Sequence, residues 1–191
     1  GNSGITFTPS ATQYWKTTTN GTKNWSTAGN WFLGTNGTGG AGRVPLPQDD
    51  VVFDASSIGA TITTISMDMV RTGRDLSLSA VTNAPLFNYN QAENFSFGSI
   101  SLSPTATYAN SMSWNFQGRG SHTFASNGLT WPAILKFTGA GGTYTLLDAL
   151  TGTQNNGGHI IGNATGLSPT FTTGSFSVTL GTRLTVNQGA T

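Results

Sequence analysis

The sequence predicts an all-β chain folded as a right-handed parallel β-helix, a solenoid with an N-terminal aromatic cap. Short apolar stretches alternate with polar residues at period two, which is typical of strands with one buried face. Many breaks are a single Gly or Asn, which suits a corner, and similar units recur about every 20 residues. A β-sandwich of the jelly-roll type remains the alternative, because short strands spaced about 8–12 residues apart fit both folds.

The N-terminal region is expected to begin with short strands and to end in an aromatic plug. Strands are predicted at 4–8 and 13–17. Trp25 and Trp31 bracket a turn, and we expect both side chains to cover the open end of the strand stack. The glycine-rich stretch 36–42 is predicted to be a loop, because its glycines add backbone freedom and no side-chain packing.

Two prolines mark the entry into the regular stack. Pro45 and Pro47 belong at an edge or at the start of a strand, because proline cannot donate a ladder hydrogen bond. The strand that follows carries Val51 and Phe53 on one face.

The chain is divided into a cap with entry strands, residues 1–54, and solenoid turns, residues 55–191. We expect the solenoid to continue beyond the chain or into a partner. Period-two alternation places each apolar set on one strand face. These sets include Ile65, Met67 and Met69; Leu76, Leu78 and Ala80; Phe95 and Phe97; Met112, Trp114 and Phe116; Leu135 and Phe137; Tyr144 and Leu146; Phe176, Val178 and Leu180; and Leu184 and Val186.

The composition excludes several classes of function. Charged residues make up 8% of the chain, against about 25% in ordinary domains, and the net charge is +1. The basic residues are scattered, so nucleic-acid binding is not expected. Cysteine is absent, which excludes disulfides and thiolate sites. No apolar run approaches the roughly 20 residues of a membrane span, so membrane insertion is not expected.

A series of short motifs near the N-terminus occurs in a recognisable order. These are Tyr14-Trp15, Asn24-Trp25-Ser26, Asn30-Trp31, Gly39-Gly40-Ala41-Gly42, Val44-Pro45 and Asp49-Asp50-Val51-Val52-Phe53-Asp54. This opening resembles that of phage virion proteins of the β-helical tail-fibre, spike or receptor-binding type and, more distantly, autotransporter-type passenger repeats. Segments 74–78 and 136–151 look like the same group, and the resemblance covers most of 14–151. It carries over no active-site residues.

The resemblance implies a particle-associated or surface protein. We expect a non-enzymatic structural protein of a bacteriophage virion, of the tail-fibre, spike or decoration type, that attaches to the host surface. Its expected location is the virion surface or the extracellular space. The expected partners are copies of itself in a trimer, other virion proteins and a host surface glycan, and no cofactor is expected. A polysaccharide depolymerase built on a β-helix and a bacterial surface adhesin are the alternatives.

The acidic cluster of Asp49, Asp50 and Asp54 is the candidate metal site. Calcium prefers several oxygen ligands, and alternation places Asp50 and Asp54 on one face of the predicted strand. The cluster lacks the spacing of a calcium-binding loop. Its alternative role is edge protection and turn capping, so we assign no metal.

A depolymerase would need two carboxyl groups about 5–10 Å apart. Asp68 with Asp75, or Asp75 with Glu93, are the pairs that adjacent turns would bring together. Each of these residues is equally able to form a surface ion pair with Arg71 or Arg74.

The two histidines, His122 and His159, do not form a recognisable catalytic set. No Gly-x-Ser-x-Gly turn accompanies them, and two histidines are too few for a zinc site. His122 alternates with Phe124 and is expected to be packed, whereas His159 follows a turn. We therefore predict no catalytic residue.

Exposed tryptophans would be able to stack on sugar rings. Trp114 is expected in the core, Trp131 at a corner, and Trp25 and Trp31 in the cap. No binding residue is assigned from the sequence. The chain has five tryptophans: Trp15, Trp25, Trp31, Trp114 and Trp131.

Overall fold

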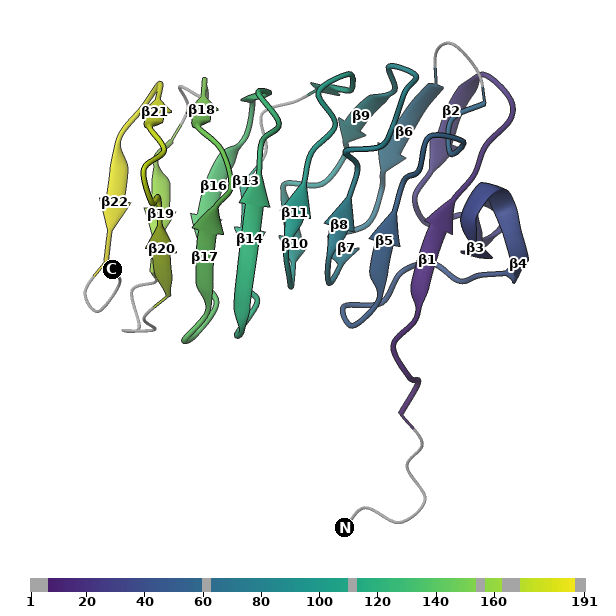
Figure 1. Cartoon of the computed structure of the whole chain (residues 1–191), viewed down its shortest axis with the longest axis horizontal. Helices are drawn as coiled ribbons and strands as arrows, with labels where there is room; N and C mark the ends of the chain where they lie inside the picture. The colour runs from purple at the N-terminus through teal and green to yellow at the C-terminus, as the bar shows by residue number, and fades with distance from the viewer. Residues whose placement is uncertain (1–6, 60–62, 110–112, 154–156, 163–168, 188–191) are drawn as a thin grey trace.

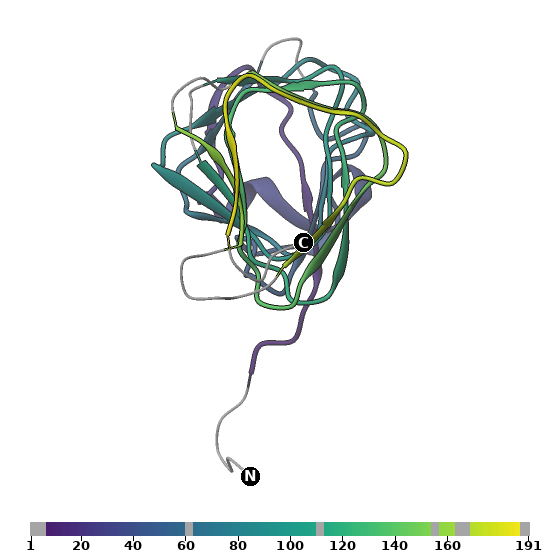
Figure 2. The same ribbon diagram turned by 90° about the vertical axis from the view of Figure 1, so that its left-hand side faces the viewer.

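The structure is a computed structural model, and it describes residues 7–59, 63–109, 113–153, 157–162 and 169–187. The strands are stacked side by side along one long axis (Figure 1). Viewed down that axis, successive turns superpose around a common centre (Figure 2). The chain is therefore a parallel β-solenoid, which confirms the predicted solenoid and excludes the jelly roll.

Two long sheets run along the solenoid. Sheet 1 has nine strands: β4 (Thr38–Ala41), β3 (Trp31–Gly34), β1 (Thr12–Trp15), β5 (Asp50–Val52), β8 (Leu76–Ser77), β11 (Ile100–Ser101), β14 (Ser121–Ala125), β17 (Thr143–Leu146) and β20 (Thr170–Thr172). Sheet 2 has six: β7 (Arg71–Gly73), β10 (Glu93–Ser96), β13 (Ser113–Phe116), β16 (Ile134–Phe137), β19 (His159–Ile161) and β22 (Leu184–Val186).

Two shorter sheets share the third side. Sheet 3 consists of β2 (Gly21–Asn24), β6 (Thr63–Met67), β9 (Leu86–Tyr89) and β12 (Thr107–Ala109), and sheet 4 of β15 (Thr130–Trp131), β18 (Leu150–Gly152) and β21 (Val178–Leu180). From β5 onward each turn visits sheet 1, then sheet 3 or sheet 4, then sheet 2. Two 3₁₀ turns, η1 (Ala28–Asn30) and η2 (Thr35–Gly37), lie before and after β3.

The register of sheet 1 stacks inward apolar side chains in a column. Val51 pairs with Leu76, Leu76 with Ile100, Ile100 with Phe124 and Phe124 with Leu146. All five side chains are buried. The partners are 22 to 25 residues apart, so the repeat is longer and less regular than the 20 residues expected. Burial of this column removes apolar surface from water at about 25 cal/mol per Å².

The N-terminal end is closed by an aromatic cluster and a pair of antiparallel strands. Trp15 packs edge-on against Trp31 at 4.9 Å and stacks on Phe53 at 5.4 Å, while Trp25 packs edge-on against Trp31 at 4.8 Å. Trp31 also donates its indole N–H to the Trp25 carbonyl at 2.8 Å. Beyond β1, β3 and β4 pair antiparallel and extend sheet 1 past the first turn. This arrangement confirms the predicted aromatic cap.

Two details at the N-terminus differ from expectation or lie outside the structure. The stretch 36–42, predicted to be only loop, contains strand β4. The prediction failed because an edge strand needs only backbone hydrogen bonds, and Gly39 and Gly40 adopt positive φ beside an irregular register. The strand predicted at 4–8 falls largely outside the described residues, and Phe7 is exposed and not in a strand.

Candidate functional site: a groove on the corner between sheet 2 and sheet 1

The alternation of side chains is reversed in strand β10. Phe95 and Phe97, expected inside with the other apolar sets, face outward, and their neighbours Asn94 and Ser96 are buried instead. Ser96 Oγ accepts the Trp114 indole N–H at 2.8 Å and shares a hydrogen bond with Thr72 Oγ1 at 2.6 Å. These bonds satisfy polar groups inside the stack, so the inverted register is tolerated. Two phenylalanine rings are thereby placed on the outer surface.

The outward rings line a groove of about 660 Å³ where the chain turns from sheet 2 into sheet 1. Residues of strands β10 and β13, and of the segments that follow β10, β13 and β16, form its walls. The lining residues are Glu93, Phe95, Phe97, Asn115, Gln117, Gly118, Arg119, Thr138, Gly139 and Ala140. Within the described residues, neither Phe95 nor Phe97 stacks on another aromatic ring, so their faces are not used by the internal aromatic contacts.

Glycines make this corner narrow. A Cβ added to Gly139 or Gly142 would overlap the Gly118 carbonyl oxygen, and one on Gly118 would overlap the His122 ring. The Gly118 N–H donates to Tyr144 Oη at 2.6 Å, which ties the corner to the core. The backbones of neighbouring turns therefore approach closely at this corner, and the longer side chains on either side form the groove walls.

Several polar groups in the groove lack a partner. Asn115 is 5% exposed, and its Nδ2 has no hydrogen-bond partner among the described residues. Thr138 Oγ1 is likewise buried without a partner in that part of the chain. Arg119 is exposed and forms no ion pair with any other residue that the structure describes. A buried donor without an acceptor costs about 1–3 kcal/mol, which a ligand acceptor would offset.

The acidic residue of the groove is already neutralised. Glu93 Oε1 accepts from Lys136 Nζ at 2.5 Å. Lys136 lies on β16 and Glu93 on β10, and both strands pair with β13, which lies between them. The ion pair therefore crosses over β13 along one edge of the groove.

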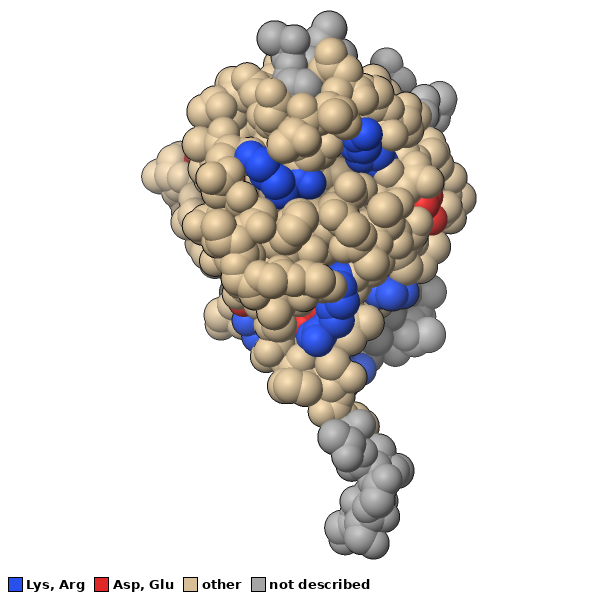
Figure 3. All heavy atoms as spheres, turned by 90° about the vertical axis from the view of Figure 1, so that its right-hand side faces the viewer, with Lys and Arg blue, Asp and Glu red and all other residues tan. Residues whose placement is uncertain are grey.

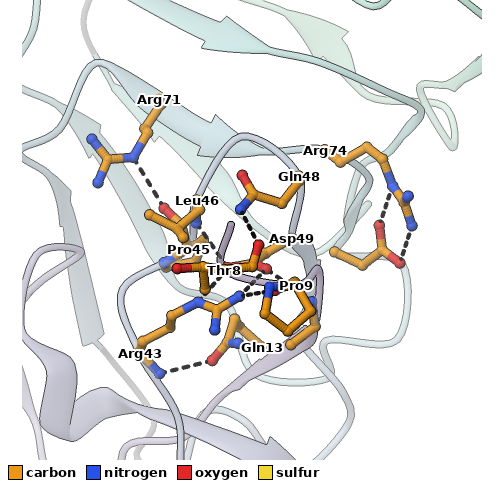
Figure 4. A network of polar contacts seen from close by, with 12 residues as sticks. Thr8, Pro9, Gln13, Arg43, Pro45, Leu46, Gln48, Asp49, Arg71 and Arg74 are labelled. Carbon is orange, nitrogen blue, oxygen red and sulfur yellow. Dashed lines mark hydrogen bonds and ion pairs between the residues drawn. The ribbon is translucent and has the colours of Figure 1, made fainter. Parts of the chain in front are cut away.

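Asp49, one of the calcium candidates, is the centre of a network in the cap (Figure 4). Its carboxylate accepts from Arg43 Nη2 at 2.6 Å and Nε at 3.0 Å, and from the N–H groups of Ala11 and Leu46, both at 2.9 Å. Burial raises the pKa of Asp49, but the hydrogen bonds from Arg43, Leu46 and Ala11 outweigh burial and hold the pKa below its ordinary value.

The other two calcium candidates are held elsewhere. Asp50 accepts from Arg74 Nε at 2.8 Å and Nη2 at 2.7 Å. Asp54 accepts from the Ser56 N–H at 2.8 Å, the Ser56 hydroxyl at 2.5 Å and the Asn36 N–H at 3.1 Å. No group of three or more metal-ligating side chains is found among the described residues. Asp49 and Asp50 form ion pairs and Asp54 caps a turn; turn capping was part of the alternative role considered from the sequence, whereas the ion pairs were not expected.

The carboxylate pairs considered for glycoside cleavage are engaged in separate contacts. Asp68 and Asp75 flank strand β7 at its opposite ends. Asp68 accepts from the N–H and hydroxyl of Ser26 at 2.9 and 2.5 Å, and Asp75 accepts from the Ser99 N–H at 2.7 Å. Glu93 is bound to Lys136. Each carboxylate therefore stabilises a contact between turns.

The histidines lie in different turns. His122 packs on Tyr144 with ring centroids 5.3 Å apart, and its Nε2 accepts the Gly120 N–H at 3.2 Å. His159 is buried, and its Nδ1 accepts the Leu135 N–H at 3.0 Å. Burial lowers the pKa of both imidazoles. Both histidines are thus packed residues that join neighbouring turns.

All five tryptophans are 0–2% exposed, so none offers a face for sugar stacking. Phe95 and Phe97, which were expected inside, are half-buried and are the aromatic residues that line the groove, whereas Phe7 and Phe176 are exposed elsewhere on the described part of the chain. The sequence does contain a hint of this reversal. Asn94 and Ser96 alternate with Phe95 and Phe97, and both pairs are able to face the inside of the strand.

Comparisons with protein-family models, curated proteins and solved structures find no match to this chain. No helix within the described residues is long and apolar enough to cross a membrane. On the N-terminal end, Lys and Arg side chains lie at separate points on a largely uncharged surface (Figure 3).

Proposed function

We propose that this chain is a non-enzymatic structural and attachment part of a bacteriophage particle, of the tail-fibre, spike or decoration type. It holds a host surface glycan in the groove on the corner between sheet 2 and sheet 1. The observation that carries the proposal is the outward pair Phe95 and Phe97 in a groove of about 660 Å³. An aromatic face beside amide side chains is a common arrangement for binding a sugar ring.

The solenoid itself supports a mechanical role. Neighbouring turns are hydrogen-bonded through parallel ladders, as in β5–β8 of sheet 1, β6–β9 of sheet 3 and β10–β13 of sheet 2; on the third side the ladder is interrupted between β12 and β15. Such a stack resists bending and holds surface residues of different turns at fixed spacing. The resemblance of the N-terminal motifs to phage virion proteins supports placing this rigid module at the virion surface or in the extracellular space.

Self-association is part of the proposal. The turns near the C-terminal end leave apolar side chains exposed, among them Phe176 at 40%, Leu184 at 45% and Val186 at 54%. Contact with copies of the chain in a trimer would cover such residues. Light scattering of the purified chain tests this: a trimer mass is expected, and a monodisperse monomer would overturn the trimer.

Peptide mass spectrometry on density-purified particles tests the virion assignment. The proposal expects the chain in fixed stoichiometry with the other particle proteins. Recovery from cell envelopes and absence from particles would make the surface adhesin the leading hypothesis.

An assay for new reducing ends tests the non-enzymatic part. Incubation with surface polysaccharide of the host is expected to release none. Release that is lost in Glu93→Gln would establish the depolymerase instead.

A further inference from the structure

Three hydrogen-bond donors of the groove have no partner within the described part of the chain. They are the Asn115 Nδ2 amide, the Thr138 hydroxyl and the Arg119 guanidinium. An amide nitrogen and a guanidinium only donate, and a hydroxyl is able to donate. A ligand that fits this set must present acceptor oxygens.

The charge of the groove is also one-sided. Glu93 is neutralised by Lys136 at 2.5 Å, so the unshared charge is the cation of Arg119. Guanidinium binds a planar carboxylate through two parallel N–H donors, which is stronger than a neutral hydrogen bond. The complementary ligand group is therefore a carboxylate.

We propose that the groove selects carboxylate-bearing saccharides, of the hexuronate type, over neutral ones. Arg119 binds the carboxylate. Asn115 Nδ2 and Thr138 Oγ1 are buried at the groove wall, and a rotation of each side chain toward the ligand lets them donate to ring or hydroxyl oxygens. This inference rests on the proposed function, because it specifies the glycan that the attachment groove holds.

The aromatic side chains favour a sugar over an acidic peptide. Phe95 and Phe97 are two residues apart on one outward face of the chain leaving β10, and both rings line the groove beside the polar groups. A pyranose ring has an apolar C–H face for such a surface and acceptor oxygens at its edge. An acidic peptide would satisfy Arg119 but would leave the aromatic faces without a matching flat partner.

Isothermal titration with a tetragalacturonate and with its fully methyl-esterified form tests the proposal. The two ligands differ only in that each sugar carries a carboxylate in the first and a methyl ester in the second. The expected result is binding of the acid form, weakened by salt, and at least roughly tenfold weaker binding of the ester. Arg119→Gln is expected to reduce binding of the acid form roughly tenfold or more.

Arg183→Gln is the matched control, because Arg183 is also an exposed arginine without an ion pair among the described residues but lies outside the groove. It is expected to leave binding unchanged. Lys136→Met is a second variant, beside the groove, which frees the carboxylate of the lining residue Glu93 to repel the ligand. This variant is expected to weaken binding of the acid form more than binding of the ester.

Three results would overturn the inference. Equal binding of acid and ester would leave attachment intact and remove the charge selection. Binding of poly-glutamate as tightly as the acid form of the saccharide would assign the groove to an acidic peptide. Absence of saccharide binding, with the fold verified by circular dichroism, would reject the inference, and the particle assay then decides separately whether the chain is a virion part.

Discussion

Removing the Asp49 carboxylate tests the account of the cap most sharply. The side chain is 0% exposed and accepts four hydrogen bonds, two from Arg43 and one each from the Ala11 and Leu46 amides. Asp49→Ala leaves the two amides without their acceptor and the guanidinium without its counter-charge. Each buried amide left unsatisfied costs about 1–3 kcal/mol, and the ion pair adds a smaller share because Arg43 is 34% exposed, so the total is about 3–5 kcal/mol. At about 2–4 °C per kcal/mol, the melting temperature should fall by roughly 6–20 °C.

Asp50→Ala is the matched control, one residue away. Its partner Arg74 is 45% exposed and Asp50 itself 29% exposed, so the pair is worth about 0–1 kcal/mol. Both variants are compared by tryptophan fluorescence during thermal and guanidinium unfolding, because three tryptophans lie in the adjacent cap. Equal destabilisation by the two substitutions would refute the reasoning that burial and hydrogen-bond count decide the cost.

Three further predictions concern packing and pH. Trp15→Ala should lower the free energy of unfolding by about 3–5 kcal/mol in urea, since it leaves a cavity in the aromatic cluster; a loss below 1 kcal/mol would contradict the packed cap. Gly139→Ala should cost about 1–3 kcal/mol because its Cβ would overlap the Gly118 carbonyl, whereas Gly29→Ala, with nothing near its Cβ, should cost little. Burial lowers the folded-state pKa of His159 below 6.5, so the unfolded state binds the extra proton first. Stability should therefore be complete above pH 6.5 and fall as the pH drops below it, a dependence measured by unfolding at several pH values and reduced in His159→Gln.

The solenoid was predictable because its inward positions require only that apolar residues occur at every second position of each strand. Val51, Leu76 and Ile100 are such residues in successive turns, and the strand register places them in one column. The tryptophans of the cap were predictable for a similar reason, since large apolar side chains near an open end find no other place to be buried.

The groove was not predictable from the same pattern. A slip of one residue exchanges the two faces of a strand, and in β10 the deciding contacts come from other turns. Ser96 is held inside by Thr72 and by Trp114, which are 24 and 18 residues away. Alternation alone reports which residues share a face but not which face is inside.

The role of the acidic cluster also depended on long-range contacts. The sequence placed Asp49 beside Asp50 and left open both calcium binding and structural capping. The structure brings the Ala11 amide to Asp49 across 38 residues and Arg74 to Asp50 across 24. Those partners account for the carboxylate oxygens, and no local spacing rule would have identified them.

The attachment groove is tested most directly by removing both outward rings. A Phe95→Ser, Phe97→Ser double variant is compared with the unmodified chain for binding to host surface polysaccharide, with thermal unfolding recorded in parallel. Binding is expected to fall at least roughly tenfold, from the loss of ring stacking, while the fold and its melting temperature change little. Unchanged binding by a folded double variant would contradict this expectation.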